Sequence, residues 1–556
     1  MAKAIAKTAA IAVAAGLTFA GSAGIATDVF AQEMNTTAVS TAPGVPDASS
    51  ITAENATLTI HKRVNPTELR PANGEADTGA SGAGLAGVGF TAERINADIT
   101  KQDEFNKVAK LANDRDIAGA KALGTGEVKA FKDTDAKGET SQTLPVGAYI
   151  IRETKTPAAD TTEAYVPADP FIVFLPMTNK EGTGWNTDVH VYPKNSMAKV
   201  SKTVVDEGEN TKSDAKGEAG KPGYLGARPA DNAVVKYTLD GVVPAAPAGR
   251  ELKNVTLTDA SKSAELQWAK ENNAFIEGVV VVRNGSEVKI DPANYTVNTT
   301  ATVPTNKPEG LAAGADQAFT VTVDAQKAGL KPGETVRVKV KATMLKDDTT
   351  SKGIENSVRE SFVFHNPGNN TDDAPKETPD DKVVTYVGNI SVYKRGDNNA
   401  ALAGAEFKIG RCNSGKDGIA GDAIQTGITD ADGNLTFPGL HVTDYVNDAE
   451  VTDMVANYCV QETKAPAGYA LPKGKNAVRE IELKRATSKA LNADKTAFDA
   501  AAGTNVIANG AVIDNVKKTT PTLPATGGMG VLIIVLAGLA IIGGGVYAAR
   551  RNSQTA

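Results

Sequence analysis

The sequence predicts an all-β chain of tandem β-sandwich domains, with a signal peptide before them and a transmembrane helix after them. The 556 residues leave room for about three or four domains of ordinary size. Aromatic residues make up only 5% of the chain, which favours β-rich modules over one large enzyme core. Short alternating apolar runs separated by turn residues recur along the chain, as they do in β-sandwich domains.

The N-terminus has the pattern of an export signal. Lys3 and Lys7 precede the apolar stretch IAVAAGLTFAG, and the small residues of VFA come just before Gln32. This order of a basic start, an apolar stretch and a cleavage-like end predicts a signal peptide at residues 1–31. Residues 32–52 are polar and contain prolines, so we expect a disordered leader there.

The C-terminus predicts a membrane-spanning helix. The run from Met529 to Ala549 carries no charge, and as a helix it spans about 30 Å, the thickness of a bilayer core. Arg550 and Arg551 follow it, as expected on a cytoplasmic side. The pentapeptide LPATG precedes this run and consists of Leu523, Pro524, Ala525, Thr526 and Gly527.

This order of residues resembles the LPXTG cell-wall sorting signal of Gram-positive surface proteins, here at residues 519–556. The resemblance implies that a membrane sortase cleaves between Thr526 and Gly527 and holds the threonine as a thioester. An amine then takes the acyl group. The protein is therefore expected to be secreted, retained briefly in the membrane, and then anchored to peptidoglycan in the cell wall.

Several function classes are disfavoured. The net charge is −7 and the chain has no basic cluster in its folded part, so we expect no nucleic-acid partner. The four histidines are scattered, and no convergent catalytic set accompanies them, so we expect no enzyme, metal or cofactor. The two cysteines, Cys412 and Cys459, belong to an exported chain, where one disulfide bond is the default expectation.

Two segments of the chain resemble each other. The first contains ATLTIHKRVN, GLAGVGFTAERI, TDAKGE and LPVGAYIIRETKTPA; the second contains GNISVYKRGDN, ALAGAEFKIGR, TDADGNLTFPGL and YCVQETKAPAGYALP. We predict an N-terminal sandwich at 53–195 and a C-terminal one at 386–518. Between them we expect a different β-rich domain at 196–366 and a polar, proline-rich linker at 367–385.

Two short motifs favour local structure over ligand binding. The segment from Asp430 to Asn434 resembles the start of a calcium loop, but His441 stands where the loop needs its glutamate, so a tight turn is expected. The tripeptide from Arg395 to Asp397 is RGD, an integrin-binding motif that also occurs often by chance.

Each copy of the repeat has a lysine in its first strand and a glutamate late in the domain. These are Lys62 with Glu153, and Lys394 with Glu462; Asn195, Asn356 and Asn515 lie near the ends of the three domains. All of these side chains would ordinarily face solvent, because lysine and glutamate are rarely buried unless paired. Buried together, however, a neutral amine attacks the asparagine carbonyl, the acid transfers the proton, and ammonia leaves an isopeptide bond.

This order of residues closely resembles the self-crosslinking, immunoglobulin-like (Cna-type) domains of Gram-positive pilins, and in particular Spa-type backbone pilins. The ETKxP segments match the E-box of that family. The segment WNTDVHVYPKN matches its pilin motif through Trp185, Val189, Val191, Tyr192, Pro193 and Lys194.

The resemblance implies a role for each motif. Lys194 attacks the thioester of Thr526 in the next subunit, and Asn195 crosslinks with Lys62 inside the domain. Lys194 is expected to face outward and Asn195 inward. In the C-terminal domain the expected set is Lys394, Glu462 and Asn515.

The middle domain leaves a choice open. We select Lys202, Asp240 and Asn356, with Lys199, Glu207 and Asn366 as rivals. Related pilins often lack the bond in the first domain, so only two bonds are expected.

The function implied is a structural subunit of a covalently polymerised pilus shaft that supports adhesion. Its partners would be pilus-specific and housekeeping sortases, identical subunits, minor tip and base pilins, and peptidoglycan. The alternative is a minor pilin or a single wall-anchored adhesin with the same domains.

Overall fold

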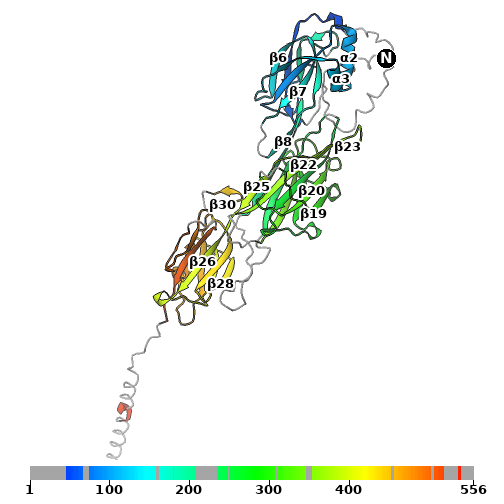
Figure 1. Ribbon diagram of the computed structural model, residues 1–556. Coiled ribbons are helices and arrows are strands. Elements are labelled where there is room, and N and C mark those ends of the chain that lie inside the picture. Colours follow the sequence, from blue (N-terminus) through cyan, green and yellow to red (C-terminus); the bar gives the residue numbers. More distant parts are fainter. Residues whose placement is uncertain are drawn as a thin grey trace, which may run out of the picture.

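The computed structural model describes residues 46–66, 74–157, 162–179, 181–206, 234–247, 249–306, 310–345, 353–451, 456–501, 506–518 and 536–539. Most of them form strands, which confirms the predicted all-β class. The strands build three bodies that follow one another in a row, here called the N-terminal, middle and C-terminal units (Figure 1). Each unit has a large hydrophobic core of its own.

In the N-terminal unit, β1 lies between β12, which runs parallel to it, and the antiparallel β6. A second sheet has the order β5-β4-β7-β9. The elements are η2 (Ala48–Ser50), β1 (Asn55–His61), β2 (Arg63–Val64), β3 (Ala83–Gly84), β4 (Gly89–Ile95), α2 (Gln102–Asn113), α3 (Ile117–Ala122), β5 (Thr125–Ala130), β6 (Glu139–Pro145), β7 (Gly147–Lys155), β8 (Glu163–Val166), β9 (Phe171–Leu175), β10 (Met177–Thr178), β11 (Trp185–Asn186) and β12 (Asp188–Val191).

The helices α2 and α3 were not predicted from the sequence. Phe105, Val108 and Ala112 recur at helical spacing along α2 and are all buried. Phe105 packs against Phe174 of β9, with ring centroids 4.7 Å apart. The helix therefore covers one edge of this unit's core and leaves its polar face to solvent.

The middle unit is a sandwich of two large sheets. One has the order β18-β17-β21-β14-β13, and the other has the order β19-β20-β15-β22. The elements are β13 (Lys194–Val205), β14 (Val234–Val242), β15 (Glu251–Ser261), β16 (Leu266–Gln267), η4 (Glu271–Asn273), β17 (Ile276–Arg283), β18 (Ser286–Lys289), η5 (Pro292–Asn294), β19 (Tyr295–Ala301), β20 (Gln317–Asp324), β21 (Thr335–Met344), β22 (Ile354–Asn366), β23 (Thr371–Asp372), β24 (Lys376–Glu377) and β25 (Asp381–Thr385).

Strand β13 belongs to two units at once. Its first residues pair in parallel with β2 and antiparallel with β8 of the N-terminal unit. From Val200 onward it pairs with β14 of the middle unit. One continuous strand thus carries residues into both cores, and the boundary between the units has no flexible connector.

The C-terminal unit also has two sheets, with the orders β29-β26-β36 and β28-β27-β32-β33. Cys412 and Cys459 form a disulfide bond, as predicted. The elements are β26 (Val387–Arg395), η6 (Asp397–Asn399), β27 (Glu406–Arg411), β28 (Gln425–Ile428), β29 (Asn434–His441), β30 (Tyr445–Val446), β31 (Ala449–Glu450), β32 (Tyr458–Lys464), η7 (Gly474–Ala477), β33 (Val478–Ile481), β34 (Lys489–Leu491), β35 (Phe498–Ala500) and β36 (Ala508–Asp514).

Several predicted segments lie outside the described residues. These are the signal peptide at 1–31, the LPATG pentapeptide, and most of the apolar run from Met529 to Ala549. Within the part of the chain that the structure describes, no helix is long and apolar enough to cross a membrane.

A buried aspartate joins the middle and C-terminal units. Asp206, just after β13, accepts hydrogen bonds of 2.6 Å from the Thr385 hydroxyl and from the Asn447 backbone N–H. The Asn447 side chain accepts one in return from the Asp206 backbone N–H, and His441 Nε2 lies 3.4 Å from the aspartate. Burial alone would raise the pKa of Asp206, but His441, Thr385 and Asn447 together lower it.

We predict that Asp206→Ala loosens this joint. Losing hydrogen bonds to a buried charge costs about 2 kcal/mol, which raises the population of open joints about 30-fold. Limited proteolysis between the two units should speed up accordingly, while Asp324→Ala, in a turn far from the joint, serves as control. Unchanged proteolysis would contradict the prediction. Because the folded pKa is depressed, the contribution of Asp206 persists above about pH 4 and disappears as pH falls through the folded pKa.

Candidate crosslinking sites

The N-terminal unit buries a lysine, a glutamate and an asparagine together. Lys62 Nζ lies 2.7 Å from Glu153 Oε2, and Asn195 Nδ2 donates to Glu153 Oε1 at 2.7 Å. The side chains of Lys62 and Glu153 are 0% and 1% exposed, and Asn195 is fully buried. Burial lowers the pKa of Lys62 to about 8, although the nearby carboxylate opposes the shift.

The fold places these three residues from different strands. Lys62 follows β1, Glu153 lies on β7 opposite Phe90, and Asn195 is the second residue of β13. Asn195 pairs in register with Val64, two residues beyond Lys62. The ring of Phe90 lies 5.6 Å from the ammonium group, so an apolar wall covers one side of the amine.

The C-terminal unit repeats the arrangement. Lys394 Nζ lies 3.5 Å from Glu462 Oε2 and donates to the Ile513 carbonyl at 3.1 Å. Asn515 Nδ2 donates to Glu462 Oε1 at 2.7 Å. Burial lowers the pKa of Lys394 to about 8 and raises the pKa of Glu462.

In both units a glycine turn fixes the lysine backbone. Gly138 and Gly433 each accept a 2.7 Å hydrogen bond from the lysine N–H, and both have a positive φ. A Cβ atom at either glycine would lie within 2.5 Å of the lysine carbonyl oxygen. The turns that the repeat shares are therefore packed directly against the two buried lysines, which explains why glycine stands there.

In the middle unit the carboxyl group beside Lys202 is Asp259 and not the predicted Asp240. Lys202 and Asp259 form an ion pair whose side chains are both 0% exposed, and Lys202 also donates to the Ser357 carbonyl at 3.3 Å. Burial raises the pKa of Asp259 and lowers that of Lys202, while Asn356 lies close enough to lower the pKa of Asp259. Asn356 is fully buried and directly precedes Ser357, whose carbonyl accepts from Lys202, so it lies beside the ion pair.

Asp240 lies elsewhere. It receives a two-pronged ion pair from Arg337, at 2.8 and 2.7 Å, on the partly exposed face of the sheet. Alternation along β14 explains this position, because Val235, Tyr237 and Leu239 face the core and Asp240 has the opposite parity.

The rival residues of the middle domain do not join this cluster. Lys199 pairs with Glu163 of the N-terminal unit at 3.1 Å and is partly exposed. Asn366 ends β22, where it pairs with Thr371, and Glu207 lies outside the described residues.

The pilin-motif lysine is less exposed than expected. Lys194 is half-buried at the first position of β13, and Asn195 beside it is fully buried, so only the inward position of Asn195 agrees fully with the expectation. Burial lowers the pKa of Lys194, and Asp77 opposes the shift.

Most of the other motif residues are buried beside this lysine. Val189, Val191, Tyr192 and Pro193 are buried, while the Trp185 indole donates to the Ser50 hydroxyl at 2.9 Å.

Other candidate sites have structural explanations. Arg395 of the RGD tripeptide is paired with Asp514, and Asp430 caps its own turn by accepting from the backbone N–H groups of Asp432 and Asn434. Within the described residues, no group of three or more histidine, cysteine, aspartate or glutamate side chains could hold a metal ion.

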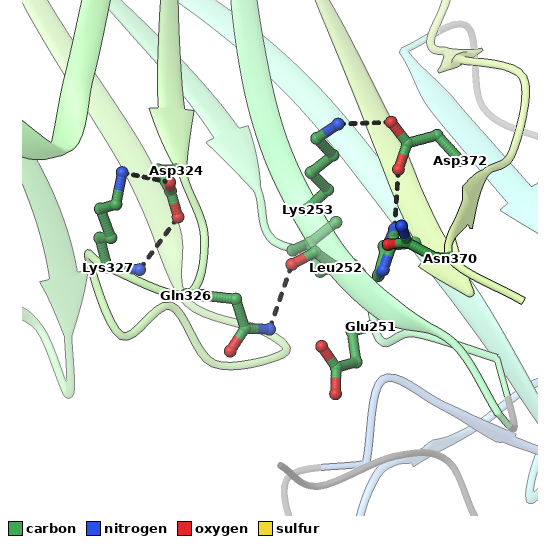
Figure 2. A pocket seen from close by; sticks show the side chains of 9 residues that line it. Glu251, Leu252, Lys253, Asp324, Gln326, Lys327, Asn370 and Asp372 are labelled. Atoms are coloured by element: carbon green, nitrogen blue, oxygen red, sulfur yellow. Dashed lines mark hydrogen bonds and ion pairs between the residues drawn. The ribbon is translucent and has the colours of Figure 1, made fainter. Parts of the chain in front are cut away.

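An open pocket of about 430 Å³ lies on the middle unit and is lined by polar and charged residues (Figure 2). Most of its charged side chains pair with one another, as Asp372 does with Lys253 and His365. It therefore does not present the convergent free groups of a catalytic site.

Comparisons with known proteins give matches along most of the chain. Residues 53–196 match the family described as "Gram-positive pilin subunit D1, N-terminal domain", and residues 388–495 match "Prealbumin-like fold domain". The chain is 27% identical to the type 1 fimbrial subunit of Actinomyces viscosus, covering 92% of this chain and 93% of the relative. It is also 27% identical to the type 2 fimbrial subunit of Actinomyces naeslundii, covering 87% of each.

Among solved structures, the full-length major pilin SpaD from Corynebacterium diphtheriae matches with a TM-score of 0.60 and 25% identity, covering 84% of this chain and 98% of SpaD. With the N-terminal pilin domain, fimbrial relatives along nearly the whole chain and this shared architecture, the chain is a Gram-positive major pilin of the Spa type.

Proposed function

We propose that the protein is the shaft subunit of a covalently polymerised surface pilus, joined by sortase through Lys194 to Thr526 of the next subunit. The observation that carries this proposal is the position of Lys194, half-buried at the first residue of β13 and at the boundary of two units. Its environment lowers the lysine pKa, which increases the neutral fraction of the amine that attacks an acyl intermediate.

We further propose that each unit crosslinks itself. The pairs are Lys62 with Asn195, Lys202 with Asn356, and Lys394 with Asn515, promoted by Glu153, Asp259 and Glu462. In each unit the buried acid takes a proton from the amine and delivers it to the departing amide nitrogen. The lysine–glutamate distance is shorter in the N-terminal unit, at 2.7 Å, than in the C-terminal unit, at 3.5 Å. We therefore include the Lys62–Asn195 bond as a third bond, beyond the two expected from the sequence.

The alternative, a minor pilin or a single wall-anchored adhesin, is not favoured. The type 1 fimbrial subunit aligns with 92% of this chain and 93% of its own length, so no large inserted binding domain distinguishes the two. As a substrate of sortase, the protein would be held briefly in the membrane and then transferred to another subunit or to peptidoglycan. Pilus-specific and housekeeping sortases and minor tip and base pilins are the partners that this role requires.

We predict that Lys194→Ala abolishes the ladder of polymers resistant to sodium dodecyl sulfate, because the acceptor amine is gone. Lys194→Arg should fail as well, since a guanidinium group stays protonated and is a poor nucleophile. The matched control is Lys199→Ala, five residues along the same strand, which removes an ion pair with Glu163 but no acceptor. A normal ladder from either Lys194 variant, seen by immunoblot of cell-wall extracts, would refute the assignment.

We predict that Asp259, not Asp240, promotes the bond in the middle unit. Each isopeptide bond releases one ammonia, so the mature protein weighs about 17 Da less per bond than its sequence. Asp259→Asn should regain about 17 Da in intact-mass measurements, since the proton shuttle is lost. Asp240→Asn removes a surface ion pair and should keep the wild-type mass. The reverse pattern, with the mass regained only in Asp240→Asn, would show that Asp240 promotes the bond.

We predict that Glu462→Ala leaves Lys394 and Asn515 unreacted. Closing a loop of about 120 residues removes unfolded-chain entropy worth about 5 kcal/mol by the disulfide model, so the variant should melt earlier. It should also become sensitive to trypsin in the C-terminal unit. The paired surface residue Glu406, which binds Lys464, provides the control Glu406→Ala. Identical melting and mass in the Glu462 variant and the wild type would rule out the bond.

A further inference from the structure

A backbone amide lies against the reacting carbonyl in the N-terminal unit. The N–H of Ala168 donates to Asn195 Oδ1 at 2.9 Å, and a second, longer contact of 3.2 Å reaches Glu153 Oε2. Ala168 lies in the sequence VPADPF between β8 and β9, with Pro167 before it and Pro170 two residues later. The two prolines restrict the backbone of this segment, and β8 is held on β13.

This contact fixes which way the Asn195 amide points. A backbone N–H only donates, so the atom facing Ala168 has to be the carbonyl oxygen. The amide nitrogen then faces Glu153 Oε1, as the structure has it. The carboxyl group of Glu153 therefore bridges the attacking amine of Lys62 and the departing nitrogen of Asn195, and it does not hold the carbonyl oxygen.

We infer that the Ala168 N–H is the oxyanion-stabilising donor of the Lys62–Asn195 crosslinking reaction, a role that rests on the proposed function. Charge develops on Asn195 Oδ1 when the amine attacks. A fixed donor at 2.9 Å from the fully buried Asn195 side chain stabilises that charge with little reorganisation. Glu153 is left to move protons.

The reaction balances with these groups alone. The Lys62 ammonium first gives a proton to Glu153, which leaves a neutral amine and a carboxylic acid. The amine forms a bond to Cγ of Asn195, and the carbonyl electron pair moves to Oδ1, which accepts from Ala168. The acid gives its proton to Nδ2 and takes a second proton from the attacking nitrogen. The carbonyl re-forms, Nδ2 leaves as ammonia, and Glu153 ends protonated.

The C-terminal unit shows that this donor is not a general feature of the cluster. Asn515 offers its nitrogen to Glu462 in the same way, but its Oδ1 accepts no hydrogen bond within the described residues. The Ala168 contact is thus an addition that belongs to the N-terminal unit, where β8 and the following segment cover the site.

The test removes one N–H group without changing a side chain. In the full mature chain, lactic acid in place of Ala168 replaces the amide with an ester, which lacks the donor and keeps the shape. The rate of the 17 Da loss, followed by mass spectrometry of peptides from the N-terminal unit, should fall about 100-fold. The same ester at Asp169 is the control and should react at the wild-type rate.

A simpler pair of variants gives a second measurement. Ala168→Pro also removes the donor, whereas Ala168→Ser keeps it, and only the first should react slowly. Because an amide N–H does not titrate, the slowing should be the same factor at every pH, whereas a disturbed Lys62–Glu153 pair would shift the pH profile.

The measurements distinguish the role of the Ala168 N–H from the existence of the Lys62–Asn195 bond. Equal rates in the ester variant and the wild type would overturn the role of Ala168 and leave the crosslink standing. A wild-type chain that never loses mass in its N-terminal unit would overturn both. Normal mass losses in the middle and C-terminal units of the variants show that the remaining chain has folded.

Discussion

The burial of a lysine beside a carboxyl group, away from water, is the constraint on which the rest of each unit depends. A buried ion pair gains little net stability, because desolvation offsets the attraction, and removing one partner costs about 3–5 kcal/mol. Lys62, Lys202 and Lys394 are all held this way with completely buried side chains. The proposed crosslink would convert the lysine and its asparagine into a neutral amide, which would remove the buried charge of the lysine and make the contact permanent.

Strand β13 connects the sites of the N-terminal and middle units through one continuous backbone. It carries Lys194 at its start, Asn195 in the N-terminal site and Lys202 in the middle site. Asn195 and Lys202 have opposite parity, so the strand presents one to each core. Under the proposed function, a pull that enters the subunit at Lys194 would reach two internal crosslinks along one backbone, and Asp206 at the far end contacts the next unit.

The sequence predicted which side chains lie together in the outer two units, because the repeat keeps the lysine, the turn glycine and the E-box glutamate in the same order. It failed for the middle acid, although a signal was present. Val255, Leu257 and Asp259 share one parity along β15, whereas Asp240 opposes the buried parity of β14. Helix α2 was missed although Phe105, Val108 and Ala112 have helical spacing. The Ala168 donor could not be predicted from a sequence pattern, because only the tertiary fold sets the direction of a loop N–H.

The central claim is that the buried clusters react. Tandem mass spectrometry of tryptic peptides from the mature wild-type chain tests it most directly, because a branched peptide identifies both residues of a bond. The account predicts branched peptides that join Lys62 to Asn195, Lys202 to Asn356 and Lys394 to Asn515. Recovery of the corresponding linear peptides in full yield, with every lysine and asparagine unmodified, would contradict it.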